Sequence, residues 1–253
     1  MSLTNRKEAQ ITGKPSARKN HMHTRSDRTN VGLSVVAASV LTAAGGSMDA
    51  WVYMDHGHVF ANAQTGNVVL FGIHAAAGDF TAAARHVPSI MAFILGLVAS
   101  RLTGAWLKNA KLNSRNVRLV VECVLLVALA SIASRLPNGV VTACVGFIAA
   151  VQITSFSHIG DVTFNTGMTT GNLIGAFSAA SVALYEPVSK KDRTHAIALG
   201  SVCLTFAAGA VLGGFCTLRF GDQTLFITAG AVGLGALMMW RTPDPIPSSP
   251  DPC

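Results

Sequence analysis

Two stretches decide the fold: FANAQTGN at residues 60–67 and TTGN at residues 169–172. The triplet Thr-Gly-Asn that they share has its central glycines 105 positions apart (171 − 66). Each triplet precedes a short apolar run, at residues 68–77 and 173–184. Glycine permits a sharp turn or a close approach, and Thr and Asn side chains can bond free backbone groups where a helix begins. The repeated triplet therefore predicts two related halves, each with a capped helix that starts at its triplet.

The composition is that of a membrane protein. Half of the residues are hydrophobic (50%), only 12% are charged, and 24 are glycine. Among the 12 acidic residues, only Asp49 and Glu122 fall inside apolar stretches. A net charge of +7 would suit a soluble nucleic-acid-binding protein, but basic residues that flank apolar spans orient a membrane protein and favour anionic lipids. We therefore expect membrane lipids as partners and no nucleic acid.

Six stretches are long enough to cross a bilayer, whose hydrocarbon core of about 30 Å takes roughly 20 apolar residues in a helix. They are residues 31–53, 88–107, 118–135, 139–157, 195–215 and 223–240. The two stretches that follow the triplets are shorter. The sequence predicts an all-α polytopic membrane protein with six spanning helices and two short Thr-Gly-Asn helices, which are either re-entrant or spanning.

The distribution of basic residues favours re-entrant triplet helices. If both triplet segments enter and leave on one side, short loops hold 8 Lys and Arg inside and 3 outside, which is the usual excess of positive charge in the cytoplasm. If all eight segments cross, the counts are 6 and 5, with no bias. Re-entrant segments leave three crossings per half, which inverts the second half and places both termini in the cytoplasm. Spanning triplet helices remain the alternative. The 8 inside residues are Lys108, Lys111, Arg115, Arg118, Lys190, Lys191, Arg193 and Arg241, and the 3 outside are Arg85, Arg135 and Arg219.

The expected organisation has a membrane domain between two tails. Residues 1–30 are predicted to form a disordered basic cytoplasmic tail, and residues 242–253 a disordered tail, because their prolines cannot continue a helix. The membrane domain, residues 31–241, divides into repeat one at 31–135 and repeat two at 139–241. A second correspondence, Phe93 to Gly96 with Phe206 to Gly209, supports the duplication. The five cysteines lack metal-ligand spacing, so we expect no metal site and no cofactor.

The sequence resembles the YoaK family of bacterial integral membrane proteins. The resemblance rests on GGSMDA at residues 45–50, FANAQTGN at residues 60–67 and TTGN at residues 169–172, and it covers residues 32–240. That family is described by a domain of unknown function. The resemblance therefore implies a bacterial inner-membrane location and no particular activity.

Asp49 is the most informative single residue, since an ionisable group inside a span costs about 3 kcal/mol or more unless it faces a partner or water. It either binds a cation or coupling proton, or accepts hydrogen bonds from a neighbouring broken helix and only holds the fold. The equivalent position in the second half is Thr154, so the carboxylate is not duplicated. The residues expected to line a substrate site are Asp49, Asn62, Gln64, Thr65, Gly66, Asn67, Asn165, Thr169, Thr170, Gly171 and Asn172.

Two other residues invite a specific interpretation. Glu122 follows Arg118 by four positions, a spacing that predicts an interfacial ion pair on one helix face. His74 lies in the first triplet helix, where it either relays protons or is a packed, hydrogen-bonded side chain.

The leading functional hypothesis is a transporter or channel for a small polar solute or ion. In an inverted repeat, two helix starts can meet near the midplane and present N–H groups and the positive ends of their dipoles, an arrangement suited to an anion or a polar neutral solute. The alternative is a non-transporting membrane scaffold or accessory subunit, because small residues at helix-packing spacing also allow a homo-oligomer. The metalloprotease and aspartyl-protease motifs of intramembrane enzymes are absent, so we expect no enzyme.

Overall fold

The computed structural model describes residues 17–110, 113–155, 158–159, 162–163, 166–167, 169–181 and 189–240. Within these residues the fold is helical apart from one short antiparallel pair, β1 (His158–Ile159) and β2 (Val162–Thr163). The long helices are α1 (Ala17–Asp55), α4 (Val87–Asn109), α5 (Ser114–Ile132), α6 (Asn138–Ser155), α8 (Lys190–Phe220) and α9 (Thr224–Trp240). The short helices are α2 (Gln64–Ala76), α3 (Phe80–Ala84) and α7 (Thr169–Ser181), with 3-10 turns η1 (Ala133–Arg135) and η3 (Gly221–Gln223).

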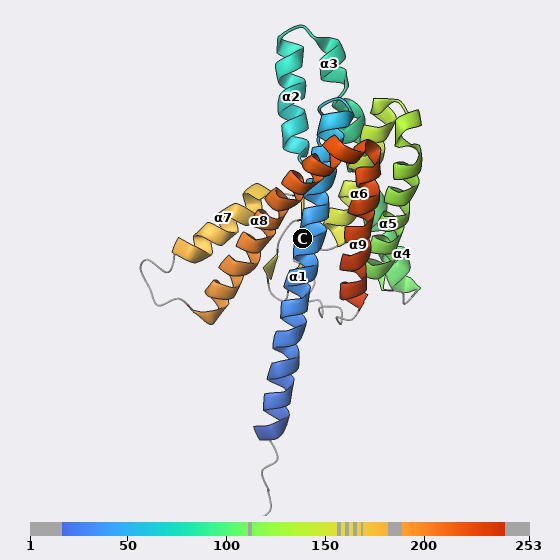
Figure 1. Cartoon of the computed structure of the whole chain (residues 1–253). Coiled ribbons are helices and arrows are strands. Elements are labelled where there is room, and N and C mark those ends of the chain that lie inside the picture. The colour runs from blue at the N-terminus through green and yellow to red at the C-terminus, as the bar shows by residue number, and fades with distance from the viewer. Residues whose placement is uncertain are drawn as a thin grey trace, which may run out of the picture.

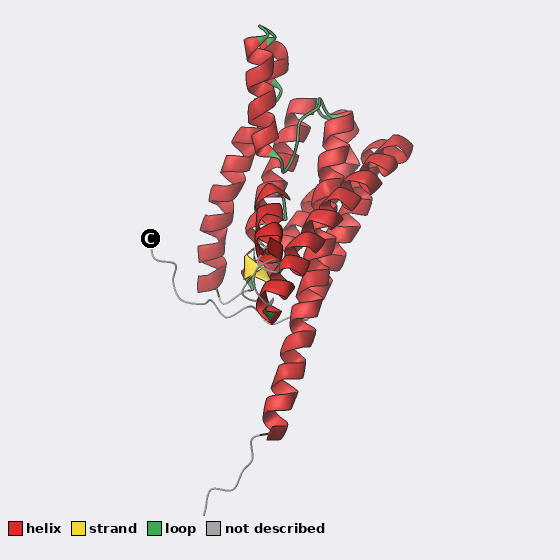
Figure 2. Cartoon of the chain, turned by 90° about the vertical axis from the view of Figure 1, so that its left-hand side faces the viewer, coloured by secondary structure: helices red, strands yellow, loops and turns green. Residues whose placement is uncertain are grey.

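The long helices run lengthwise in one bundle, as Figure 1 shows. Helices α1, α5 and α8 run towards one end of it, and α4, α6 and α9 run back. The α2–α3 hairpin projects beyond the first end, while α7 lies beside α8 and points away from the bundle to the side. The view turned by 90° shows the same lengthwise arrangement and the projecting hairpin (Figure 2).

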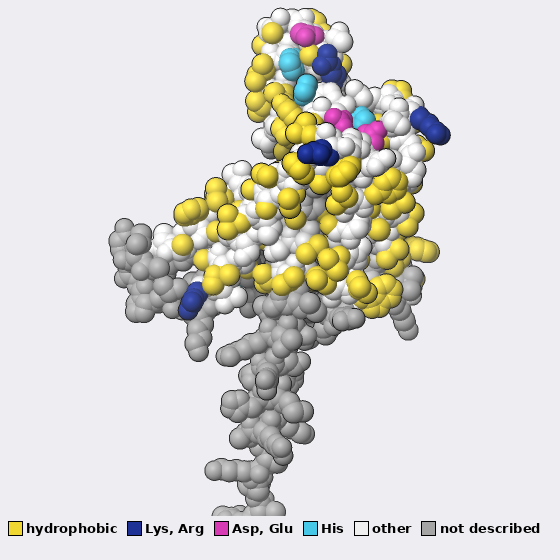
Figure 3. Space-filling view, viewed as in Figure 1, with side chains coloured by type: hydrophobic (Ala, Val, Ile, Leu, Met, Phe, Trp, Pro, Cys, Tyr) yellow, Lys and Arg dark blue, Asp and Glu magenta, His cyan; other side chains and the backbone are white. Residues whose placement is uncertain are grey.

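Within the described residues, five segments are long and apolar enough to cross a membrane: Ser34–Asp55, Phe80–Leu107, Arg115–Arg135, Asn138–Ser155 and Arg193–Trp240. The last has 48 residues and contains most of α8 and all of α9. Apolar side chains also cover much of the outer surface (Figure 3), and Leu204 and Leu218 are 74% and 75% exposed. A surface of this kind is unfavourable in water and suited to lipid. The structure thus agrees with an all-α, membrane-embedded protein.

The helices coincide closely with the six stretches predicted from the sequence, with one correction. The disordered tail was predicted to reach residue 30, whereas α1 already begins at Ala17. Nucleation is the costly step of helix formation, so a helix that already exists in the apolar part of α1 can extend towards the N-terminus without that cost. Ala, Arg and Lys are also good helix formers. Residues 1–16 and the proline-rich tail at 242–253 lie outside the described residues.

Helix α1 packs against α8, and α6 packs against α4, so in each contact a helix of one half lies against a helix of the other half. Both contacts bring backbones together at glycine. A Cβ atom on Gly209 of α8 would overlap the backbone of Ala43 in α1, and one on Gly96 of α4 would lie 2.8 Å from the carbonyl oxygen of Phe147 in α6. These are the two glycines of the repeated Phe-x-x-Gly motif. Helices α5 and α9 pack against each other.

The two triplet helices match in length and in spacing. Helices α2 and α7 have 13 residues each, and their first residues, Gln64 and Thr169, are 105 positions apart, like the triplets. Helix α2 starts one residue before Thr65, and its N-cap, Ala63, makes no side-chain cap hydrogen bond. Thr65 therefore does not cap α2, whereas Asn67 of the same triplet does bond backbone groups ahead of the helix, at Phe60.

Candidate functional site

Asp49 holds the segment that precedes α2. Asp49 is 5% exposed, six residues before the end of α1, and its Oδ1 accepts the N–H groups of Ala61 and Asn62, each at 2.7 Å. The amide nitrogen of Asn62 lies 3.4 Å from the same oxygen. A carboxyl group in this position complements the positive end of the α2 dipole. Two roles were predicted for Asp49, ligand binding and hydrogen bonding to a neighbouring short helix. The structure shows hydrogen bonds of the second kind, to the segment just before α2.

Asn67 closes the same segment into a ring of hydrogen bonds. Its Oδ1 accepts the N–H of Phe60 at 2.9 Å, and its Nδ2 donates to the carbonyl oxygen of Phe60 at 2.8 Å and to Oε1 of Gln64 at 3.0 Å. Both backbone groups of one loop residue are thus satisfied by one buried amide. Such satisfaction is required wherever a helix begins inside a membrane.

Ser89 in α4 and His86, the residue before α4, are two further partners that were not predicted from the sequence. Ser89 Oγ donates to the carbonyl oxygen of Phe60 at 3.0 Å, and Gln64 Nε2 lies 3.2 Å from the same hydroxyl. His86 Nδ1 lies 3.4 Å from Asn67 Oδ1, and its ring stacks on that of His74 with centroids 5.8 Å apart. The ring of His74 therefore packs against a second histidine ring, and its role in relaying protons stays a prediction. The only sequence signal for Ser89 and His86 was their position near the polar start of the apolar stretch 88–107.

The predicted triplet residues fall into two groups. Thr65, Thr170 and Gly171 are exposed, whereas Asn172 is buried like Asn67. Gly66 faces the ring of Phe60, and the carbonyl oxygen of Thr169 accepts the Sγ–H of Cys203 at 3.7 Å. Asn165 lies outside the described residues. The asparagines, and not the threonines, therefore point into the protein.

The segments that precede the two triplet helices meet inside the bundle. A Cβ atom on Gly167, which precedes α7, would lie 2.7 Å from Asn62 Oδ1. Gln152 of α6 reaches the same region, donating from Nε2 to the carbonyl oxygen of Leu41 in α1 at 3.0 Å. Thr166 is fully buried beside them. Gln152 and Thr166 were not predicted as site residues, although Gln152 is the only Asn or Gln in the apolar stretch 139–157.

Residues 37–238 match the family described as "Protein of unknown function (DUF1275)". The chain belongs to this family. No curated protein and no solved structure matches it. The matched residues of this DUF1275 protein contain both triplets, Asp49 and Gln152, in agreement with the resemblance to a membrane-protein family of unknown function. Membership of this family implies no particular activity.

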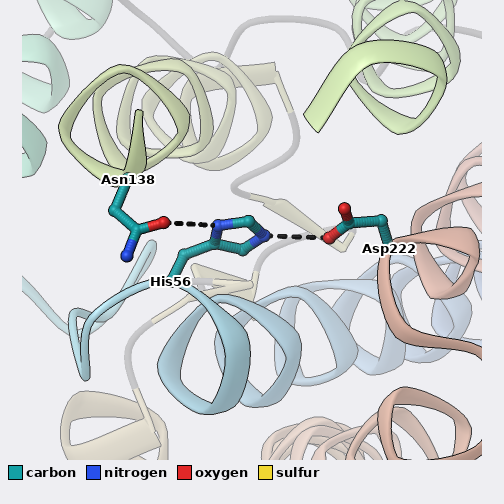
Figure 4. Close-up of polar contacts among 3 residues, drawn as sticks. All are labelled: His56, Asn138 and Asp222. Atoms are coloured by element: carbon teal, nitrogen blue, oxygen red, sulfur yellow. Dashed lines mark hydrogen bonds and ion pairs between the residues drawn. The ribbon is translucent and has the colours of Figure 1, made fainter. Parts of the chain in front are cut away.

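A second polar cluster joins helix ends at one end of the DUF1275 bundle (Figure 4). His56, after the end of α1, is 6% exposed. Its Nε2–H donates to Asp222 Oδ1 in η3 at 2.9 Å, and its Nδ1 lies 3.1 Å from Oδ1 of Asn138, the first residue of α6. Among the described residues, no group of His, Cys, Asp and Glu has the arrangement of a metal site. The two hydrogen bonds of His56 connect the end of α1 to α6 and to η3.

The ion pair predicted between Arg118 and Glu122 does not form. Glu122 is fully buried, and neither carboxyl oxygen has a hydrogen-bond partner within the described part of the chain. Arg118 instead donates from Nη1 to the carbonyl oxygen of Thr154 at 3.2 Å. Thr154 is in the last turn of α6, where carbonyl groups have no intrahelical partner. A free carbonyl at a helix end thus competes successfully with the neighbouring carboxylate.

Proposed function

We propose that this protein is an inner-membrane transporter or channel for a small polar solute or ion, without catalytic chemistry. Its site lies where the segments before α2 and α7 meet. One observation carries the proposal: Asn62 contacts Gly167, the residue 105 positions further on, at a buried point between α1 and α6. In transporters built from two repeats, substrate and ions bind at the repeat interface, near interrupted helices.

We infer that the two halves are inverted repeats. Exchanging the halves turns the α1–α8 contact into the α6–α4 contact, and the glycine that closes each contact occupies the same motif. Helices α2 and α7 have equal lengths and point in different directions from the centre (Figure 1). Residues that lie near a two-fold axis contact their own equivalents, as Asn62 and Gly167 do.

The same arrangement supports six crossing helices, α1, α4, α5, α6, α8 and α9, with α2 and α7 re-entrant. Asp49 is six residues before the end of α1 and bonds the chain just ahead of α2. Helix α2 therefore starts about 9 Å below the end of α1, at a rise of 1.5 Å per residue. The charge distribution, with 8 basic residues against 3, supports a cytoplasmic location for both termini.

Single cysteines at Ala77 and Ala180 test this topology, because both side chains are exposed near the far ends of α2 and α7. The native cysteines are first replaced by alanine, and intact cells are treated with a membrane-impermeant thiol reagent. We expect Ala77→Cys to be labelled and Ala180→Cys to be protected until the membrane is permeabilised. Labelling of both, or of Ala180→Cys alone, contradicts the inverted arrangement.

Uptake into proteoliposomes tests transport itself. Radiolabelled sodium, chloride and glycerol represent a cation, an anion and a polar neutral solute. We expect uptake of one of them above protein-free liposomes, and a loss of that uptake when Gly167→Val fills the meeting point of the two segments. Uptake of none, with the protein folded and correctly oriented, counts against the proposal.

One observation favours the alternative of a non-transporting scaffold or accessory subunit. The α2–α3 hairpin projects from the bundle and exposes apolar side chains such as Val69, Ile73 and Phe80 (Figure 3). A protein partner would bury that surface as well as lipid would. A single partner that co-purifies in stoichiometric amount, together with absent uptake, would favour this alternative.

A further inference from the structure

Glu122 carries a carboxyl group that is buried inside a membrane-spanning helix. It is 0% exposed, and neither Oε1 nor Oε2 has a hydrogen-bond partner in the part of the chain that the structure describes. The residue lies seven positions (122 − 115) into the apolar segment Arg115–Arg135, about 10 Å from its start at a rise of 1.5 Å per residue. An ionisable side chain at such a depth is costly, and it marks a functional site by default.

The basic residues around Glu122 do not neutralise it. Arg118, one turn earlier in α5, donates from Nη1 to the carbonyl oxygen of Thr154 at 3.2 Å, in the last turn of α6. Helices α6 and α9, which pack against α5, contain no acidic or basic residue. Helix α4 also contacts α5 and contributes Arg101, which is exposed, and Lys108, in its last turn.

The other titratable groups of these elements are thiols or lie at the far end of α5. Cys123 follows in α5, and Cys144 is in α6. Thiols with an ordinary pKa of about 8.5 are mostly neutral at pH 7. Arg135 and Asp222 belong to η1 and η3, which contact α5 at the opposite end from Arg118. Among the described residues, Arg118 is therefore the charged group best placed to interact with the carboxyl group.

Burial without a partner decides the protonation state of Glu122. An isolated carboxylate in an apolar interior is so costly that the group takes up a proton and becomes neutral instead. A neutral carboxylic acid also explains why Arg118 binds a carbonyl oxygen, although residues four positions apart on a helix are neighbours. The arrangement in the structure is therefore that of the protonated side chain.

Release of the proton gives Arg118 a second partner. When the acid gives its proton to water, the carboxylate that remains is a stronger acceptor than a carbonyl oxygen, since charge-assisted hydrogen bonds are roughly twice as strong as neutral ones. Arg118 Nε is buried and has no partner among the described residues, so a donor is at hand. The guanidinium group would then leave Thr154, whose helix ends one residue later and whose chain continues to Gly167, where the two halves meet.

We propose that Glu122 is a proton-binding site, and that its proton decides whether Arg118 binds Thr154 or Glu122. This inference deepens the proposed function and rests on it in one respect, since it makes the proton the coupling ion of transport. Proton binding itself can be measured without any transported solute.

Dicyclohexylcarbodiimide is the probe, because it modifies protonated carboxyl groups in apolar surroundings. The purified protein in detergent is treated at a series of pH values, and mass spectrometry of its peptides locates the adduct. We expect an adduct on Glu122 at pH 7 that is lost as the pH rises. The infrared spectrum at pH 7 should contain the band of a protonated carboxyl group, and Glu122→Gln should remove that band.

Arg118→Gln tests the exchange of partners. It removes the positive charge that stabilises the carboxylate, so the adduct should persist to a pH about one unit higher than in the wild-type protein. Arg118→Lys is the matched control, because it keeps a positive charge four residues before Glu122. It should follow the pH dependence of the wild-type protein.

Absence of both the adduct and the infrared band in the folded wild-type protein would overturn the proposal. An identical pH dependence in Arg118→Gln and the wild-type protein would overturn it as well. The band without the adduct would support it, since infrared absorption needs no access for a reagent. A protonated Glu122 without uptake of any solute would leave the proton site standing and refute transport, whereas uptake by a protein with an ionised Glu122 would do the reverse.

Discussion

The side-chain oxygen of Asn62 lies against the backbone of Gly167, so close that a Cβ atom there would be 2.7 Å from it. Asn62 is held in place from the other side, because its amide nitrogen donates to the carbonyl oxygen of Gly45 and its own N–H donates to Asp49. It therefore cannot withdraw without breaking those bonds. The contact joins the two halves of the chain at the point where each of their short helices begins.

Replacement of Gly167 by alanine should accordingly be destabilising. We expect Gly167→Ala to lower the free energy of unfolding by about 1–3 kcal/mol, the usual cost of overpacking. Gly171→Ala is the control, since an added Cβ meets nothing within 4 Å at that position. Denaturant titration in mixed detergent micelles measures both variants. Equal stability of the two would show that the contact is not tight in the folded protein.

Asn67 offers a test of the first triplet. Asn67→Leu removes the hydrogen bonds that Asn67 makes to the N–H and to the carbonyl oxygen of Phe60. The carbonyl oxygen keeps its hydrogen bond from the hydroxyl of Ser89, whereas the N–H is left without a partner. We expect a loss of about 2–4 kcal/mol, because a buried N–H group is left unsatisfied and a hydrogen-bonded ring is opened. Thr65→Val, in the same triplet but exposed, should change stability by less than about 0.5 kcal/mol. If the two variants behave alike, the asparagine has no special structural role.

The sequence predicted the long helices well because one physical condition dominates them. A segment in lipid must satisfy its backbone internally, so about 20 apolar residues in a row are almost sufficient to define a spanning helix. The same reasoning identified Asp49, Asn62 and Asn67, which are polar residues in or beside apolar runs. It failed for the extent of α1, since Arg and Lys after Ala17 fit either a helix or a free tail.

The rest of the site depends on contacts between segments far apart in the chain. Gln152 and Thr166 matter because α6 and the segment before α7 meet Asn62, and no local pattern encodes that meeting. The four-residue spacing of Arg118 and Glu122 predicted an ion pair that does not form. Arg118 instead binds the carbonyl oxygen of Thr154, which belongs to another helix and cannot be foreseen from local spacing. The capping expected of Thr65 failed for a similar reason, since Asp49 of α1 supplies the acceptor.

Glu122 should be replaceable with a gain in stability. Its carboxyl oxygens have no hydrogen-bond partner among the described residues, in an interior where an apolar side chain of similar size fits. We expect Glu122→Met to raise the free energy of unfolding by about 1–3 kcal/mol, because it removes a desolvated polar group. Val124→Met on the exposed face of α5 should have little effect. A clear loss in Glu122→Met would mean that the carboxyl group is needed by the fold.

Gly209 tests whether the α1–α8 contact is equivalent to the α4–α6 contact. In Gly209→Ala the new Cβ would overlap the backbone of Ala43, which cannot turn aside as a side chain can. We expect the α1–α8 contact to open and the free energy of unfolding to fall by about 3 kcal/mol. Gly200→Ala in the same helix has open space and should gain up to about 1 kcal/mol from helix propensity.

Gly96→Ala should resemble Gly209→Ala, because its Cβ would meet the Phe147 carbonyl oxygen at 2.8 Å in the equivalent α4–α6 contact. If only one of these two variants is destabilised, the two contacts are not equivalent and the inferred repeat loses its packing support.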